Sequence, residues 1–398
     1  MPVDSSFSRR FENVVRLTKF FSSQGQDTAQ AKIEATKIEE QALSLATTLE
    51  DYEGRIDHCI DLHSQLFIPE GTTVEATSND EETLLDELFN TDGPTLGHYE
   101  WATFHADGVT STIYKAKDTN THAEEKIVAL KVMTPSQMVA PHNAHREVKV
   151  LQDAKSKNVV PLLESFQQSG GKLVLVFPFL KQDLENLLRS GRLSVMQSSM
   201  VFEGLFSALA HLHKHRIIHR DVKPGNVLLK TMNGPVYLID FGISWSQDDT
   251  GAEPVDKKVT DVGTTCYRPP EILFGDRGYD TSLDMWAAGC VVAEMVTKGH
   301  HPMFDAGPMG SELGLIKSMF STLGTPTDTD WPSAVRYPDW GSLKFQDFPA
   351  KSWEEILPGA SEDAVDFVSK TVCYEPTRRL TAEEALNHQL AENIRSRR

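Results

Sequence analysis

The residues best suited to chemistry are two aspartates, a lysine and an asparagine in the segments HRDVKPGN and YLIDFG, which begin at positions 219 and 237. Asp221 can accept the proton of an attacking hydroxyl, a general-base role that contributes roughly 10²- to 10⁴-fold in rate. Asn226 and Asp240 offer the oxygen ligands that Mg²⁺ prefers when it also binds substrate phosphates. Lys223 would lie beside a transferred phosphate as a point charge. This set fits phosphoryl transfer, in which a protein mainly positions the reactants and screens their charge.

The tripeptide HRD is common by chance, but here KPGN follows it in register and DFG stands downstream. With these segments the sequence resembles the protein kinase family, and the lysine two residues after the aspartate resembles its serine/threonine branch. The resemblance covers about residues 96–390. It implies ATP and Mg²⁺ as cofactors and a protein Ser or Thr hydroxyl as acceptor. It also implies a two-lobed α+β fold, with a small lobe of antiparallel sheet and one helix and a larger, mainly helical lobe.

The elements that must position these residues follow from the same resemblance. The strand VALK ends at Lys131, which would bridge the α and β phosphates of ATP. The segment PHNAHRE, from residue 141, matches the PSTAIRE helix of cyclin-dependent kinases at Pro, Ala, Arg and Glu. Its Glu147 would pair with Lys131 and so assemble the site. His145 replaces the apolar residue with which that helix docks into cyclin, which argues against dependence on a cyclin.

A hairpin before Lys131 should cover the nucleotide phosphates. Alignment on the segment YKA, from residue 114, places Ala106, Gly108 and Ser111 where the family has three glycines. Glycine lets backbone amides approach phosphates closely. Loss of two of the three glycines therefore predicts weaker ATP binding.

The connector between the lobes should hold the nucleoside. The segment KLVLVFPFLKQDL, from residue 172, reads as an apolar strand that runs into a helix. Because Pro178 has no amide hydrogen, the connector offers adenine only a carbonyl at this residue. The same residues could instead belong to the core. By resemblance, the nucleoside contacts are Phe177 behind the adenine, the carbonyl of Pro178, the backbone of Leu180, Asp183 at the ribose, and Leu228.

The segment between DFG and the later PPE motif is the one that kinases use as a switch. Its GTTCYR stretch, from residue 263, resembles the GTxxY stretch of serine/threonine kinases, in which Thr264 would contact Asp221 and Lys223. In proline-directed kinases the residue at position 263 holds a strained backbone that favours proline after the target hydroxyl. Gly263 relaxes that position at little cost, so we predict no strict demand for proline.

The same segment departs from cyclin-dependent kinases where they carry an activating phosphate. Val259 stands at the position of the phosphorylated threonine, and Trp245 replaces one of the three arginines that hold its phosphate. We therefore expect the segment to be ordered without phosphorylation. The remaining arginines and the carboxylates expected to meet them in place of the phosphate are Arg146, Arg220, Asp256 and Asp261.

The larger lobe carries three further family features. Asp284 begins a DxWxxG motif, whose aspartate anchors the backbone of the catalytic loop in the family. Glu271 and Arg379 would form a buried ion pair, and removing one partner of such a pair costs about 3–5 kcal/mol. Residues 323–340 resemble the insert of cyclin-dependent kinases.

Composition limits the other classes of function. The net charge of −18 argues against nucleic acid as a partner and would attract a basic protein substrate. The four cysteines form no CxxC pair, so neither a disulfide framework nor a zinc site is indicated. The longest apolar run is well short of the ~20 residues of a membrane span, and the first residues lack the apolar core of a signal peptide. We expect an intracellular protein of the nucleus or cytoplasm, with no membrane partner.

Residues 1–68 form an extension before the kinase-like part. Apolar residues alternate spacings of four and three between positions 31 and 66. This pattern predicts a coiled-coil helix that binds a partner or dimerises, or an antiparallel hairpin that packs on itself or on the kinase-like part. Residues 69–95 are acidic and polar, as in a flexible linker or an acidic regulatory tether. The predicted division continues with a small lobe at 96–180, a larger lobe at 181–390 and a basic tail at 391–398.

The departures at His145, Trp245, Val259 and Gly263 point the same way. Together they resemble the single-subunit fungal kinases that phosphorylate the activation-segment threonine of cyclin-dependent kinases. A cyclin-dependent kinase with a divergent cyclin is the alternative interpretation. A pseudokinase scaffold is a third, because two loop glycines are missing, although the complete set of catalytic residue types argues against it.

Overall fold

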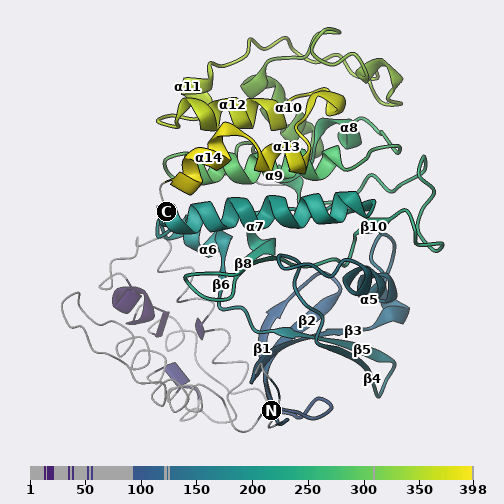
Figure 1. Ribbon diagram of the computed structural model, residues 1–398, viewed down its shortest axis with the longest axis vertical. Coiled ribbons are helices and arrows are strands. Elements are labelled where there is room, and N and C mark those ends of the chain that lie inside the picture. The colour runs from purple at the N-terminus through teal and green to yellow at the C-terminus, as the bar shows by residue number, and fades with distance from the viewer. Residues whose placement is uncertain are drawn as a thin grey trace. The chain divides into compact units, whose positions relative to one another are not determined.

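The computed structural model describes residues 13–14, 16–21, 35, 38–39, 52, 55–56, 93–120, 123, 126–307 and 310–396. The chain divides into two compact units, Met1–Asp86 and Glu87–Arg398, and each is described by itself (Figure 1). No helix in the described part of the chain is both long enough and apolar enough to cross a membrane.

The described residues of the first unit are helical. The Tyr52 hydroxyl donates a 2.7 Å hydrogen bond to Glu39 Oε1 within this unit. Most of the predicted helical seam, and the predicted linker up to residue 92, lie outside the described residues, so the hairpin or coiled coil stays a prediction. The described apolar side chains share one small buried cluster, formed by Leu17, Phe21, Ala35, Tyr52 and Ile56.

The small lobe is an antiparallel sheet with the strand order β1-β2-β3-β5-β4. Side chains alternate along β3, so Val128 and Leu130 enter one apolar cluster while Met133 packs in another with Ala144 of the helix α5. Lys131 is in step with Met133 and therefore lies on the face that α5 covers. The elements are β1 (Tyr99–Asp107), β2 (Ser111–Asp118), β3 (Ile127–Met133), η1 (Pro135–Gln137), α5 (Ala144–Asp153), β4 (Glu164–Gln168) and β5 (Lys172–Pro178).

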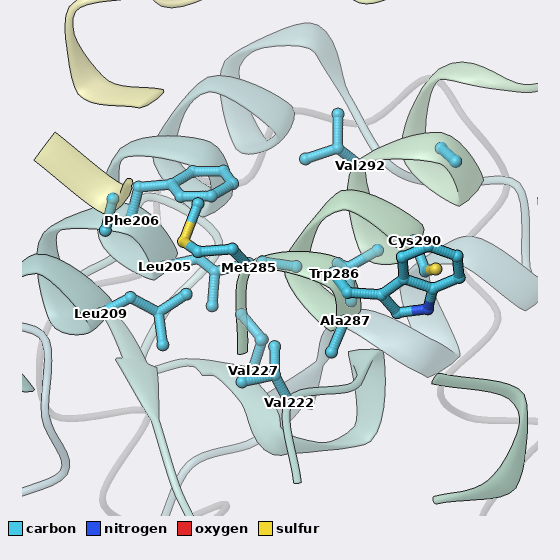
Figure 2. Close-up of a cluster of buried hydrophobic side chains, with 14 of the residues drawn as sticks. Leu205, Phe206, Leu209, Val222, Val227, Met285, Trp286, Ala287, Cys290 and Val292 are labelled. Carbon is cyan, nitrogen blue, oxygen red and sulfur yellow. The ribbon is translucent and has the colours of Figure 1, made fainter. Parts of the chain in front are cut away.

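The larger lobe is built around α7 (Val195–Lys214) and α9 (Ser282–Val296). In Figure 1 the sheet and α5 lie on one side of α7, and α9 and the later helices lie on the other. The α9 segment is apolar around its whole circumference, and nearly all of it is buried. Figure 2 shows part of this core, in which Leu205 and Leu209 of α7 lie close to Met285 of α9.

Shorter helices complete the larger lobe. They are α6 (Leu184–Arg189), α8 (Pro270–Leu273), α10 (Glu312–Leu323), α11 (Trp353–Ile356), α12 (Glu362–Thr371), α13 (Ala382–Leu386) and α14 (Gln389–Ser396), with the 3₁₀ turns η2 (Pro224–Asn226), η3 (Thr265–Tyr267), η4 (Ala334–Arg336) and η5 (Pro376–Arg378).

Short strands hold the segments that carry the candidate residues. The strands β8 (Val227–Leu229) and β9 (Val236–Leu238) pair with each other, and β8 also pairs with β6 (Gln182–Asp183). Because Val227 pairs with Leu238, Asn226 and Asp240 are brought to the same end of this sheet. The strand β7 (Ile217–Ile218) pairs with β10 (Trp245–Ser246), which ties the catalytic loop to the segment after DFG.

Candidate active site

One ammonium group joins the two lobes. Lys131 Nζ lies 2.6 Å from Glu147 Oε1 on α5 and 2.8 Å from Asp240 Oδ1 after β9. The helix is fixed at its start by Asn143, whose side chain accepts a hydrogen bond from the Arg146 amide. The charge of Lys131 holds the pKa of Asp240 well below its ordinary value. Three residues predicted from separate segments therefore meet at one point, with Asp240 fully ionised.

The Asp221 carboxylate is held on both oxygens. Thr264 donates to Asp221 Oδ1 from its backbone amide at 2.9 Å and from its hydroxyl at 2.8 Å. Asn226 Nδ2 donates to Asp221 Oδ2 at 2.9 Å, and Lys223 Nζ lies 3.0 Å from the same oxygen. Lys223 Nζ also donates to the Thr264 hydroxyl at 2.8 Å. This geometry suits a general base, because the carboxylate is oriented while a hydroxyl already occupies one of its acceptor positions.

The catalytic loop is anchored by a buried carboxylate of α9. Asp284 accepts hydrogen bonds from the backbone amides of His219 and Arg220, each at 2.9 Å. His213 Nε2 lies 2.9 Å from the same carboxylate. Burial alone would raise the pKa of Asp284, but the hydrogen bond to His213 lowers it. Sequence reasoning missed His213 as a positioning residue. The available signal was Asp284 in the DxWxxG motif, because a buried aspartate needs a polar partner.

A cavity of about 410 Å³ lies between the two lobes, a volume in the range of small-molecule sites. His105 of β1 also lines it, at a ring-centroid distance of 5.1 Å from Phe179, and sequence reasoning missed this residue. Its place directly before the glycine-type hairpin was the available signal. Every residue predicted to contact the nucleotide lines this cavity: Ala106, Gly108, Ser111, Lys131, Phe177, Pro178, Leu180, Asp183 and Leu228.

The donor set at one wall of this cavity fits a magnesium ion bound with a nucleotide. Asn226 donates through Nδ2 to Asp221, and its amide oxygen has no hydrogen bond among the residues that the structure describes. Asp240 uses only Oδ1 on Lys131, and 45% of its side chain is exposed. Both residues line the cavity. Their free oxygens are hard ligands of the kind that Mg²⁺ prefers, and the bound ion would neutralise charge on ATP phosphates.

Comparison with known proteins agrees with this geometry. Residues 106–391 match the protein kinase domain family. The chain is also 33% identical over 288 residues to serine/threonine-protein kinase csk1 of Schizosaccharomyces pombe, an alignment that covers 70% of this chain and 92% of that protein. The chain is a serine/threonine protein kinase. The two-lobed α+β fold predicted from its motifs is thereby confirmed, and the kinase resembles the cyclin-dependent-kinase-like group.

Two features of this kinase's nucleotide cavity bear on the predicted contacts. The Gly108 amide donates to the Ser111 carbonyl at 2.7 Å, and a Cβ at Gly108 would lie 3.0 Å from Ser111 Oγ. The hairpin is thus tight at the one position that kept its glycine. The Asp183 carboxylate caps α6 by accepting from the Asn186 amide at 2.7 Å. A ribose contact at Asp183 would therefore share that carboxylate with the helix cap.

The kinase backbone at Gly263 is left-handed, a conformation that glycine adopts at little cost. Its φ is +80°, and a Cβ there would lie 2.8 Å from the Arg220 carbonyl. Arg268 Nε donates to the Gly263 carbonyl at 2.8 Å. This hydrogen bond occupies the Gly263 carbonyl, while the missing Cβ leaves the left-handed conformation without a clash. The absence of a strict demand for proline after the target hydroxyl stays a prediction.

The predicted acidic partners of the two arginines are wrong. Asp261 pairs with Arg268 at 2.7 Å. The reason is that Arg268 is already held nearby by its hydrogen bond to the Gly263 carbonyl. Asp256 is exposed and makes no ion pair with either arginine in the described part of the kinase. Asp249 and Glu253 meet Arg146 and Arg220 instead.

The large-lobe ion pair of the kinase has the geometry expected from the sequence. Arg379 donates from both terminal nitrogens to Glu271, at 2.6 and 2.7 Å. Neither side chain is more than 1% exposed. This bidentate pair ties α8, which follows the activation segment, to the end of η5.

Proposed function

We propose that this kinase acts as a single-subunit activator of cyclin-dependent kinases, transferring the ATP γ-phosphate to the threonine of their activation segment. The observation that carries the proposal is the outer face of α5. Its exposed residues are polar, and they are His145, Lys149, Gln152 and Asp153. A cyclin docks through an apolar residue at position 145 in the resembling family, and this face offers none.

The catalytic geometry supports the reaction class. Bound Mg²⁺–ATP would supply the phosphoryl group and neutralise its charge. Asp221 would orient the substrate hydroxyl and accept its proton in place of the Thr264 hydroxyl, while Lys223 stands on the same side. Asn226 and Asp240 would hold the ion, and Lys131 would bind phosphate oxygens beside Glu147. The complete set argues against a scaffold without catalytic activity.

We further propose the division of the chain made from its sequence, with residues 1–68 as a helical extension that binds a partner or packs on itself. Residues 69–95 would link it to the lobes at 96–180 and 181–390, and residues 391–398 would form the tail. The proposed substrate places the kinase inside the cell, in the nucleus or cytoplasm. A cyclin-dependent kinase with a divergent cyclin is the alternative function.

The test incubates the purified full chain alone with ATP, Mg²⁺ and a cyclin-dependent kinase that lacks its activating phosphate. We expect one phosphothreonine, in the activation segment of the substrate, when the modified residue is mapped by mass spectrometry. Asp221→Asn is the control and should leave the substrate unmodified. Activity that appears only after a cyclin is added would favour the alternative. A wild-type chain that turns over no ATP would point to a scaffold.

A further inference from the structure

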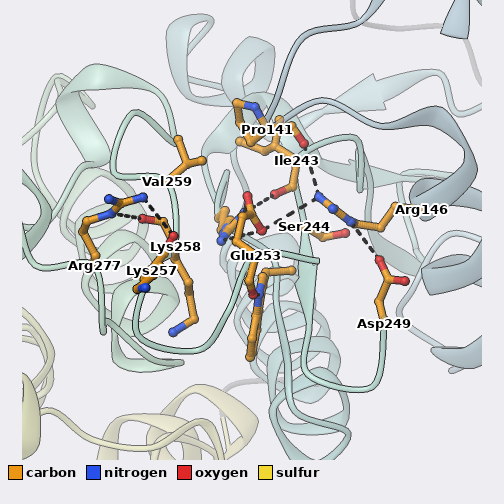
Figure 3. Close-up of polar contacts among 12 residues, drawn as sticks. Pro141, Arg146, Ile243, Ser244, Asp249, Glu253, Lys257, Lys258, Val259 and Arg277 are labelled. Carbon is orange, nitrogen blue, oxygen red and sulfur yellow. Dashed lines mark hydrogen bonds and ion pairs between the residues drawn. The ribbon is translucent and has the colours of Figure 1, made fainter. Parts of the chain in front are cut away.

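Arg146, one residue before Glu147 in α5, is held by the activation segment, defined here as residues 243–268. Arg146 Nε donates to Asp249 Oδ2 at 3.0 Å, and its terminal nitrogen donates to the Gly251 carbonyl at 3.0 Å. Figure 3 shows the Asp249 contact and the approach of Arg146 to Glu253. The position of α5 is therefore coupled to the path of the activation segment.

Arg220, one residue before Asp221, is almost fully buried, and a buried guanidinium is costly without a negative partner. Glu253 brackets it, with Oε1 3.3 Å from one terminal nitrogen and Oε2 3.5 Å from the other. Glu253 Oε2 also lies 4.0 Å from Arg146 Nη1. Burial alone would raise the pKa of Glu253, but the charge of Arg220 brings it below its ordinary value. One ionised carboxylate therefore serves both arginines.

The backbone that carries Glu253 is itself fixed. Trp245 Nε1 donates to the Glu253 carbonyl at 2.9 Å. The Lys258 ammonium lies 4.7 Å from the centre of the Trp245 ring, and it donates to the Tyr279 carbonyl at 2.7 Å and to the Val255 carbonyl. The tryptophan that replaces a phosphate-binding arginine of the family thus orders the segment by other contacts.

We propose that Glu253 is a positioning residue of this kinase, whose carboxylate takes the place of an activating phosphate by holding Arg220 and Arg146. Through these arginines it fixes the catalytic loop at Asp221 and the helix α5 at Glu147. A phosphate would bring about −1.5 to −2 charges, whereas Glu253 brings one. Asp249 supplies the second negative charge, on Arg146. The kinase is active without phosphorylation of its activation segment.

The test compares the full-length wild type with Glu253→Gln, which keeps the size of the side chain and removes its charge. The substrates are ATP, Mg²⁺ and a degenerate Ser/Thr peptide mixture, so the result does not depend on the proposed protein substrate. We expect kcat to fall at least tenfold while the KM for ATP changes less than twofold, because Glu253 does not line the nucleotide cavity. Glu253→Asp should recover part of kcat. If Glu253 had only a structural role, Glu253→Gln would lower the melting temperature without lowering kcat selectively over the KM for ATP.

Asp256→Asn is the matched control, because Asp256 is an exposed acid of the same segment. Its kcat should stay within twofold of the wild type. In a second arm, the wild type is treated with a protein phosphatase until its intact mass shows no phosphate, and we expect full activity. Loss of activity with the phosphate, or wild-type kcat in Glu253→Gln, overturns the proposal. If Glu253→Gln does not fold, Glu253→Asp and the phosphatase arm decide the question.

Discussion

At the scale of single residues, the kinase places several buried charges where only a matched partner makes them tolerable. Lys131 Nζ is shared by Glu147 and Asp240, and Arg379 by the two oxygens of Glu271. Glu294 of α9 differs, because its buried carboxylate has a neutral partner, the Tyr267 hydroxyl, which donates to Oε1 at 2.6 Å. The positive partners offset the cost of burial in the first two cases, whereas burial raises the pKa of Glu294.

Variants of Lys131 and Glu147 can show separately how Lys131 contributes to catalysis and to stability. Lys131→Met should lower phosphoryl transfer by roughly 10²-fold or more, because a fixed positive charge beside the phosphates is lost. It should also destabilise the fold, because Glu147 is left buried without its cation. Adding Glu147→Gln should restore the melting temperature and leave activity low. Activity that returns with stability in the double variant would contradict the role of Lys131 at the phosphates.

Glu294 gives a pH dependence with a defined sign. Burial raises the pKa of Glu294 from 4.5 to about 7. Between these values the unfolded chain loses its proton before the folded one does, so this group lowers the free energy of unfolding as pH rises from about 4.5 to 7. Glu294→Gln removes the effect, and its stability relative to wild type should increase by up to about 3 kcal/mol between pH 5 and pH 8. Denaturant titrations across this range measure it, and a difference independent of pH would refute the prediction.

At the scale of elements, α9 organises two loops. One is the catalytic loop at Asp221, and the other is residues 263–268, called the substrate loop below. Asp284, near the start of α9, holds the amides of His219 and Arg220, and Glu294, near its end, holds Tyr267 of η3. A helix buried on almost all sides is a rigid platform for two loops that must meet at Asp221. The chemistry therefore depends on elements that contribute no reacting atom.

The substrate loop gives a prediction about sequence preference. Arg268 occupies the Gly263 carbonyl, so this oxygen is not free to accept the amide of the residue after the target hydroxyl. Proline has no amide hydrogen and loses nothing by this arrangement. Arg268→Ala should free the carbonyl and raise kcat/KM for alanine over proline at that position by about 2- to 10-fold, the worth of one hydrogen bond. Paired peptides measure the ratio, and Arg268→Lys, which loses Nε, should behave similarly. An unchanged ratio in both variants would argue against this role.

At the scale of the whole molecule, the net charge of −18 sets how the kinase meets its substrates. Long-range attraction between an acidic enzyme and a basic protein is screened over about 8 Å at physiological ionic strength. The KM for a basic protein substrate should therefore rise several-fold between 50 and 500 mM NaCl. The kcat should change little, because the Lys131 and Arg220 pairs are buried. A neutral peptide is the control, and equal salt effects on both substrates would contradict steering by net charge.

Short motifs in the sequence indicate the family and, through that resemblance, its two lobes and the residues that line the nucleotide cavity. These features follow from short motifs, and Asp221, Lys223 and Asn226 lie within one six-residue segment. Lys131 and Glu147 follow from the resemblance of VALK and PHNAHRE to motifs of the family. Local geometry is set by neighbours in the chain, so local patterns predict it.

The side chains that meet across long loops are selected by the packing of the fold. Several acids of the activation segment could reach the two arginines, and the path fixed by Trp245 and Lys258 selects Glu253 over Asp256. The contact of His213 with Asp284 likewise joins residues that are far apart in the chain. The sequence allows many alternative pairings of these side chains, because a long loop can close in many ways at similar entropic cost. The packing of the folded lobes leaves one of them.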